Sequence, residues 1–179
     1  MPALATANAE EAALAALMQR LAAVPERHSA FTETQHSGLL DVPLVQSGTL
    51  HYRRPDYLER RVGGRRAVID GERVILDDGH GGRRVLALDD VPLLRAFVVS
   101  FRATLGGDLT ALRRHYRVGF AQQAEGWRLR LVPRDPRMQA LVESVTIEGR
   151  GDRPLRMILL EANGDRTVTE FHPLRQDDD

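Results

Sequence analysis

The chain of 179 residues contains no cysteine and no lysine. Without a thiol it cannot form a disulfide or a thiolate zinc site, and it offers no cysteine for nucleophilic catalysis or N-terminal lipid attachment. Without lysine, its 25 cationic side chains are all arginines, and 25 acidic side chains balance them. Because proteins that coat nucleic acid need an excess of positive charge, a net charge of zero argues against a nucleic-acid partner.

Long apolar runs and catalytic signatures are also missing from the sequence. No stretch of about 18 uncharged apolar residues is present, so no segment is expected to span a membrane. There is no Gly-x-Ser-x-Gly turn, no phosphate-binding glycine loop and no dinucleotide fingerprint. None of the six histidines lies two or four residues from another, so no metal-ligand spacing is visible. We therefore expect no catalytic residue, no metal and no cofactor.

One acidic cluster leaves an alternative open. Asp77, Asp78 and His80 lie together in a glycine-rich segment and could bind a cation. Aspartate, glycine and histidine are common in hairpin turns for conformational reasons, which favours a turn. If one of these side chains reached an interior cavity, an enzyme acting on lipids would be the better interpretation.

The pattern of apolar residues predicts one helix, then strands, two helices and more strands. Apolar residues recur at helical spacing in 10–24, and Pro25 ends that pattern. Asp89 and Asp108 are the predicted N-caps of the two central helices, at 91–105 and 109–115. One short helical segment is predicted within 135–142. Strands are predicted at 29–36, 43–53, 57–62, 66–70, 73–77, 84–88, 116–121, 127–132, 144–148, 155–161 and 167–171.

This order predicts a mainly β protein with helices (α+β), built as one highly curved, barrel-like antiparallel sheet with helices against its concave side. A sheet of this size has room for a ligand. We expect a single domain at 10–172, followed by an acidic tail at 173–179. Residues 1–9 include Ala7-Asn8-Ala9, the small-x-small form that signal peptidases cut. They are either the remaining tail of an export signal or a disordered start.

Apolar side chains mark one face of several predicted elements. In the strands they occupy every second position, at Leu50, Tyr52, Trp127, Leu129, Leu131, Met157 and Leu159. In the first central helix they form a stripe of Val91, Leu94, Phe97, Val98, Phe101 and Leu105. An ordinary core and a lidded lipid cavity both fit this inventory, and composition does not separate them.

Five short motifs, in order and spacing, resemble the bacterial periplasmic lipoprotein carrier family LolA. Residues 24–33 (VPERHSAFTE) are similar to that family's helix end and first strand. Residues 47–58 (SGTLHYRRPDYL) resemble its Gly-x-Leu-x-x-x-Arg-Pro-x-x-Phe strand pair, and 68–74 (VIDGERV) its Asp-Gly hairpin. Residues 126–134 (GWRLRLVPR) and 144–147 (SVTI) resemble two later strands. The likeness runs from about residue 10 to 171 and looks closest to a divergent LolA-related branch.

The resemblance implies an incomplete barrel of eleven antiparallel strands, covered by a helical lid around a hydrophobic cavity for acyl chains. It implies a periplasmic carrier, and not an enzyme, that shuttles lipoproteins or another acylated envelope lipid toward the outer membrane. Its partners would be an inner-membrane release complex or exporter and an outer-membrane acceptor, and its own export signal would be missing from this sequence. A protein-interaction module of the same fold without lipid cargo is the alternative.

The resemblance also assigns site residues. Arg54 matches the family's Arg-Pro arginine, which hydrogen-bonds carbonyls of the lid helix and keeps the empty form closed. The lid helix would contribute Leu94, Phe97, Val98, Phe101 and Leu105. The cavity walls would be Phe31, Leu50, Tyr52, Leu58, Ile69, Trp127, Leu129, Leu131, Met157 and Leu159. The chain departs from the family at Glu59-Arg60-Arg61 and Val74-Ile75, where aromatic residues are usual, so the cavity and its cargo would differ: a glycolipid or a fatty acid is credible.

Overall fold

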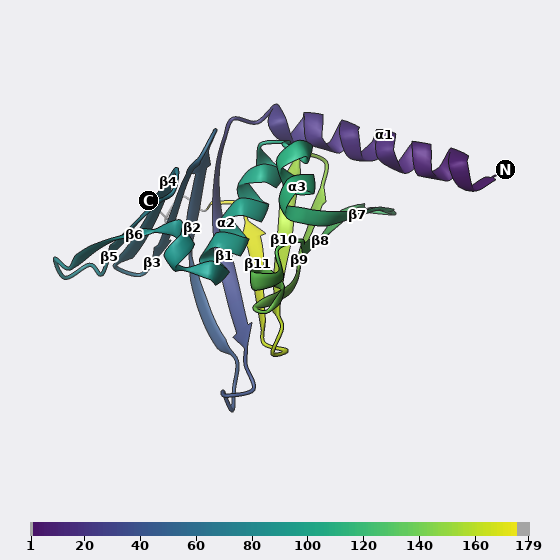
Figure 1. The fold of residues 1–179 in the computed structure, drawn as a ribbon. Coiled ribbons are helices and arrows are strands. Elements are labelled where there is room, and N and C mark those ends of the chain that lie inside the picture. The colour runs from purple at the N-terminus through teal and green to yellow at the C-terminus, as the bar shows by residue number, and fades with distance from the viewer. Residues whose placement is uncertain (1, 175–179) are drawn as a thin grey trace.

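The computed structural model describes residues 2–174 and contains one large sheet with helices on one side (Figure 1). The strands are β1 (Glu26–His36), β2 (Leu44–Arg53), β3 (Tyr57–Val62), β4 (Arg65–Asp70), β5 (Arg73–Asp77), β6 (Arg83–Ala87), β7 (Tyr116–Gln123), β8 (Gly126–Pro133), β9 (Val142–Arg150), β10 (Arg153–Glu161) and β11 (Arg166–His172). The helices are α1 (Pro2–Ala22), the 3-10 turn η1 (Leu88–Asp90), α2 (Pro92–Leu105), α3 (Leu109–His115) and α4 (Pro136–Gln139).

The strand order is β6-β5-β4-β3-β2-β1-β11-β10-β9-β8-β7, and every neighbouring pair is antiparallel. The chain therefore builds two hairpin meanders, which are joined where the first strand pairs with the last. Strands β6 and β7 end the sheet on its two sides, so the sheet stays open. The predicted α+β class, with eleven antiparallel strands in an incomplete barrel, is confirmed.

Every predicted strand is present, with each end within three residues of the observed one. The turns explain this accuracy, because glycines with positive φ stand where strands had to end. Gly71 (φ 59°) closes the β4–β5 hairpin and Gly164 (φ 91°) the β10–β11 hairpin. Asp108 caps α3 as predicted, its side chain accepting a hydrogen bond from the amide of Ala111.

One helix start and one helix cap differ from the prediction. Helix α1 begins at Pro2, eight residues before the expected start, because the intervening alanine-rich stretch has high helix propensity and no glycine. The interpretation of residues 1–9 as the tail of an export signal stays a prediction. The predicted N-cap Asp89 is wrong: Pro92, fixed in a helical φ, opens α2 and leaves Val91 at the cap. Of the predicted acidic tail, 175–179 lies outside the described residues.

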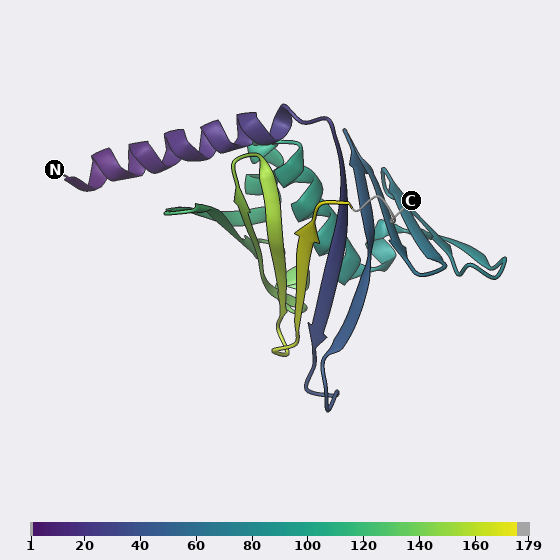
Figure 2. The ribbon, with the colours of Figure 1, turned by 180° about the vertical axis from the view of Figure 1, so that it is seen from behind.

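Helix α2 lies in the concavity of the sheet, and α1 crosses one end of it (Figures 1 and 2). Leu14, Leu17 and Leu21 bury the C-terminal half of α1 in the same core as α2 and the inner face of the sheet. Residues 7–12 of α1 lie outside this core and are exposed. The N-terminal part of α1 extends beyond the edge of the sheet. No helix of residues 2–174 is long and apolar enough to cross a membrane.

The outer face of the sheet carries a buried carboxylate. Glu59 on β3 is 7 % exposed and accepts hydrogen bonds from Arg66 (2.8 Å), Arg61 (2.5 Å) and the Tyr57 hydroxyl (2.5 Å). The hydrogen bond from Arg66 is the largest of the effects that together lower the pKa of Glu59 to about 2, against the opposing effect of burial. Glu59 thus links β3 and β4 through charge-assisted hydrogen bonds.

We expect Glu59 to make the protein sensitive to acid. Because its folded-state pKa lies below the unfolded value, its stabilisation is complete above about pH 4.5 and is lost as the pH falls toward 2. The full contribution is about 3 kcal/mol, from roughly 1.4 kcal/mol per pKa unit. Urea unfolding should show Glu59→Gln to be less stable than the wild type at pH 7, and the difference should shrink toward pH 2. A difference that is the same at both pH values would contradict this assignment.

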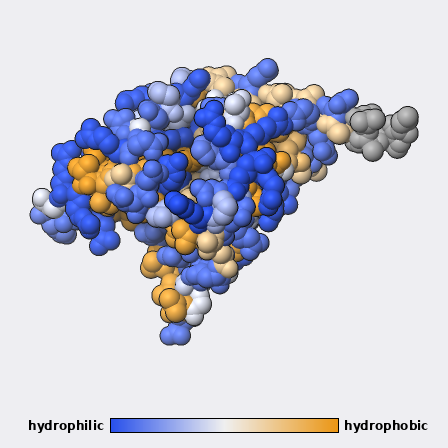
Figure 3. Space-filling model, viewed as in Figure 1, coloured by the Kyte–Doolittle hydropathy of each residue, from blue (hydrophilic) through white to orange (hydrophobic). Residues whose placement is uncertain are grey.

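The β1–β2 hairpin projects from the body and has an apolar tip (Figure 3). Its exposed side chains are Leu39 (94 % exposed), Leu40, Val42 (71 %), Leu44 and Val45. The base of this tip is held by the β10–β11 turn, where Asp165 accepts hydrogen bonds from the Ser37 hydroxyl (2.8 Å) and the Gly38 amide (3.0 Å).

Candidate functional site

The ten residues predicted to line a cavity all lie on the concave face of the sheet. Strand register places them there, since Phe31 opposes Phe171 across β1–β11 and Tyr52 opposes Leu58 across β2–β3. Each is at most 8 % exposed, and all belong to one core: Phe31, Leu50, Tyr52, Leu58, Ile69, Trp127, Leu129, Leu131, Met157 and Leu159. Their packing partners include helix α2.

Helix α2 occupies the space where the sequence predicted acyl chains. Val98, Phe101 and Leu105 are buried against the sheet, while Leu94 and Phe97 are partly buried at the edge of the same core. The rings of Phe97 and Phe101 stack with centroids 5.5 Å apart, and Phe101 stacks on Phe171 of β11 at 5.3 Å. The helix therefore fills the inner face of the sheet.

A small cavity of about 110 Å³ remains between α2 and the sheet. Phe101 and Leu105 of α2 and Leu50, Tyr52 and Phe171 of the sheet line it. Ligand pockets usually measure about 300–1,000 Å³, so this volume is too small for a long acyl chain. Binding such a chain here requires α2 to move.

A second, open groove of about 500 Å³ lies over strands β2 to β6. Val62, Ala67 and Leu76 contribute to its lining, which also includes Arg60 and Arg84. Figure 3 shows apolar surface over strands β4 to β6 framed by hydrophilic side chains. Because Val62 and Leu76 also pack against the core, the groove continues the apolar surface that α2 covers.

Two arginines on one face of α2 attach the helix to hairpin turns of the sheet. Arg102 donates to the carbonyl oxygen of Gly71 (2.8 Å) in the β4–β5 turn and to that of Asp56 in the β2–β3 turn. Arg95, two helical turns earlier, pairs with Glu72 of the β4–β5 turn at 3.3 Å. Burial lowers the pKa of Arg102, but a guanidinium remains charged.

Further hydrogen bonds of α2 run mostly within the helix. The buried hydroxyl of Ser100 donates to the Ala96 carbonyl (2.7 Å) and that of Thr104 to the Ser100 carbonyl (2.7 Å). Tyr116 of β7 donates to the same Ala96 carbonyl at 3.2 Å, and burial raises its pKa to about 12. The hydroxyls of Ser100 and Thr104 thus find their partners within α2, whereas Tyr116 ties α2 to β7.

The sequence matches one known family over most of its length. Residues 5–170 match the family described as outer membrane lipoprotein carrier protein LolA-like. The chain belongs to this family. No curated protein sequence matches it significantly.

Several solved structures are similar to this LolA-like chain at low sequence identity. A LolA superfamily protein from Nitrosomonas europaea is 9 % identical, with a TM-score of 0.47 and coverage of 90 % of this chain and 93 % of that one. A putative outer membrane lipoprotein-sorting protein domain from Vibrio parahaemolyticus is 11 % identical, with a TM-score of 0.47 and coverage of 92 % and 91 %. MucB in complex with MucA(peri) is 15 % identical, with a TM-score of 0.43 and coverage of 92 % and 58 %.

Arg54, the latch expected from the LolA likeness, holds a different helix. Its guanidinium donates to the carbonyl of Ala22 at 2.6 Å, at the C-terminal end of α1. Within residues 2–174 the side-chain hydrogen bonds that tie α2 to the β2–β3 turn come from Arg102. The Arg54–Asp56 turn therefore anchors both helices. The sequence analysis did not identify Arg102. A usable signal was present, because Arg95 and Arg102 are seven residues apart and therefore lie on one face of an otherwise apolar helix.

The acidic cluster of the LolA-like chain forms the β5–β6 turn. Asp78 accepts hydrogen bonds from the amides of His80 (2.8 Å) and Gly82 (2.9 Å), and Asp77 accepts one from that of Gly79 (2.9 Å). His80 is exposed. These residues shape a surface turn, and Asp77 and Asp78 also contribute to the lining of the open groove.

Glu26, His28 and His51 form a group of possible metal ligands on the outer face of the sheet. Their spacing along the sequence did not predict this group. His28 and His51 are opposite each other in the β1–β2 register, and their rings stack at 3.9 Å. Both approach the same Glu26 oxygen, at 3.4 and 2.7 Å, and donor atoms of all three lie within 4.8 Å of one another. The hydrogen bond from His51 is the main cause that lowers the pKa of Glu26. Pairing across a hairpin, rather than spacing along the chain, brings them together.

Proposed function

We propose that this LolA-like protein is a carrier of the cell envelope that binds the acyl chains of a lipoprotein or another acylated lipid on its concave face. One observation carries the proposal: α2 lies on a continuous apolar surface that extends beyond it into an open groove of about 500 Å³. A ligand seated in the groove would extend beneath the helix by displacing it. Binding and release, rather than a chemical step, are the proposed activity.

The balance between the helix and the cargo explains how such a carrier would release what it binds. Each buried methylene contributes roughly 0.8 kcal/mol, so some 40 methylenes of a multi-acylated cargo would give about 30 kcal/mol in an ideal pocket. Non-covalent binding saturates near roughly 20 kcal/mol, and a carrier must work below that limit. Because Phe101 and Leu105 occupy the same surface in the closed form, cargo must displace them, and the net gain falls.

In this proposal the β2–β3 turn holds both helices in place on the sheet. Arg54 would hold the end of α1 and Arg102 would hold α2, both through carbonyl oxygens that a guanidinium can bond without an acid partner. We place the protein in the periplasm, between an inner-membrane release complex or exporter and an outer-membrane acceptor. The apolar tip of the β1–β2 hairpin is the exposed surface that best suits contact with either.

Native mass spectrometry of the protein purified from the envelope of its own host tests the proposal. We expect a co-purifying acylated species that organic solvent releases, because a surface of this size recruits amphiphiles. A mass equal to that of the polypeptide alone, with no uptake of an added acyl probe, would refute the carrier function.

The second candidate is a protein-interaction module without lipid cargo. The filled interior favours it, since α2 leaves a cavity of only about 110 Å³. The exposed hairpin tip favours it as well, with Leu39 94 % exposed. A polypeptide-only mass together with a bound envelope protein would support this alternative.

A further inference from the structure

The small cavity under α2 has a mouth where β11 stops. Pairing between β1 and β11 ends at Ala30 and His172, so residues 26–29 of β1 have β2 as their only strand neighbour among the described residues. Arg27 of this stretch and Arg153 of β10 both line the cavity. When α2 moves aside, an elongated ligand can enter here, between the sheet and the C-terminal half of α2.

Two polar atoms at this mouth lack a hydrogen-bond partner among the described residues. Arg27 and Tyr52 are directly opposite in the β1–β2 register and both line the cavity. The Tyr52 hydroxyl, in a side chain only 1 % exposed, and the Nε of Arg27 are buried without a partner. Because more than about 90 % of buried polar groups are hydrogen-bonded, two such atoms on directly paired residues point to a ligand group that both can bond.

The charges around these atoms specify that group. An arginine Nε can only donate, and a tyrosine hydroxyl can donate as well, so the missing partner is an acceptor. Burial raises the pKa of the Tyr52 hydroxyl, while the guanidiniums of Arg54, Arg27 and Arg102 favour its ionised form and Asp56 opposes them. Asp152 also acts on Arg27, and Asp56, Glu72 and Asp70 act on Arg102. At the Tyr52 hydroxyl itself the three guanidiniums outnumber the single carboxylate, and an acceptor that carries negative charge fits there best.

We infer that this mouth binds the anionic headgroup of an acylated lipid, with a carboxylate or phosphate oxygen between Arg27 and Tyr52 and the acyl chain directed under Phe101 and Leu105. The inference rests on the proposed function and narrows its cargo. The ester and amide carbonyls that attach acyl chains to a lipoprotein are neutral, so an anionic lipid is the better match for this site.

The experiment compares the affinities of two probes, palmitate and methyl palmitate, for the same purified protein. They share the acyl chain and differ in the charge of the head, so the ratio of their dissociation constants isolates the headgroup site. We expect palmitate to bind at least about tenfold more tightly. A hydrogen bond to a charged group changes affinity by about tenfold or more. Tyr52→Phe and Arg27→Met should therefore each reduce the ratio by about that factor.

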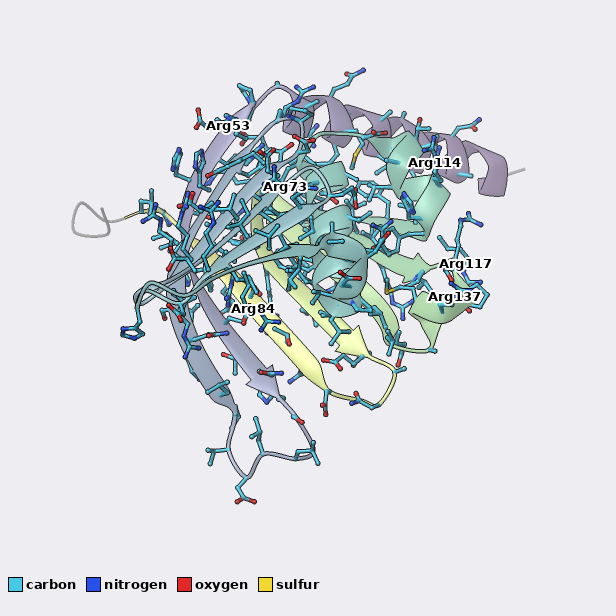
Figure 4. All side chains as sticks on the ribbon, turned by 60° about the vertical axis from the view of Figure 1, so that its left-hand side comes forward. Arg53, Arg73, Arg84, Arg114, Arg117 and Arg137 are labelled. Atoms are coloured by element: carbon cyan, nitrogen blue, oxygen red, sulfur yellow. The ribbon has the colours of Figure 1, made fainter. Side chains whose placement is uncertain are left out.

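Arg73→Met serves as the matched control, because Arg73 is exposed on β5 and its side chain lies on the outer face (Figure 4). It should leave the ratio unchanged. Acetate, which has the charge but no chain, should not displace palmitate. If both probes bind equally, if the Tyr52 and Arg27 variants keep the wild-type ratio, or if acetate displaces palmitate, the headgroup site is refuted while the carrier function stands. If neither probe binds, the carrier function fails, and this inference fails with it.

Discussion

Replacing Arg102 with methionine is expected to release α2 from the sheet. The substitution keeps the apolar stem and removes the donors to the carbonyls of Gly71 and Asp56. Hydrogen bonds to charged groups contribute about 1.5–3 kcal/mol each, so closure should weaken by about 2–3 kcal/mol in total, allowing for partial exposure. The open form should become about 30- to 150-fold more populated. Hydrogen exchange of peptides covering 92–105 measures this change.

The control for Arg102→Met is Arg113→Met. Arg113 of α3 pairs with Glu11 of α1 at 2.6 Å, but both side chains are about half exposed, and such pairs contribute little. Exchange of 92–105 should therefore stay close to wild type in this variant. If Arg102→Met exchanges in the same segment no faster than Arg113→Met, Arg102 does not hold α2.

Phe101→Ala should change stability and acyl binding in opposite directions. Phe101 is 3 % exposed and stacks between Phe97 and Phe171, so its truncation should lower the free energy of unfolding by about 3–5 kcal/mol. The same change enlarges the cavity under α2 and removes a side chain that competes with cargo. A fluorescent acyl probe should therefore bind more tightly, while urea unfolding shows a less stable protein.

Leu112→Ala separates this effect from general loosening of the fold. Leu112 of α3 is fully buried and outside the small cavity under α2, and its truncation should cost about 2–5 kcal/mol. We expect it to lower stability without raising acyl affinity. Equal gains in acyl affinity for both variants would show that loosening alone is responsible, and no gain for Phe101→Ala would show that Phe101 does not compete with cargo.

The positions of the strands could be predicted because the turns between them depend on local residues. Asn163-Gly164 is a turn signal wherever it occurs between two alternating segments, and the β10–β11 hairpin forms around it. The N-cap of α2 was predicted wrongly because two local signals competed, and Pro92 prevailed over Asp89. Helix α1 was placed too late because its first turns lack the apolar periodicity on which the prediction relied.

The site could be predicted only in part, because its polar contacts are not local. The partners of Arg102 are 46 and 31 residues away in the sequence, and neither Asp56 nor Gly71 contributes a side chain to the hydrogen bonds. The same holds for His28 and His51, which only the hairpin register joins. The apolar residues were identified correctly as inward-facing, but a core and a lidded cavity use the same residues. A core differs from a lidded cavity in the free energy that holds α2 against the sheet. No local sequence pattern reports that free energy.

The most direct test of the central claim uses Trp127, the single tryptophan of the chain. Its buried ring packs over Gly149, next to Arg153 at the mouth of the cavity, so it reports on the covered side of the sheet. Titration with palmitate brominated along its chain should quench Trp127 fluorescence to saturation, and unbrominated palmitate should reverse the quenching by competition. If the brominated chain binds without quenching Trp127, or does not bind at all, acyl chains do not enter beneath α2 and the account is wrong.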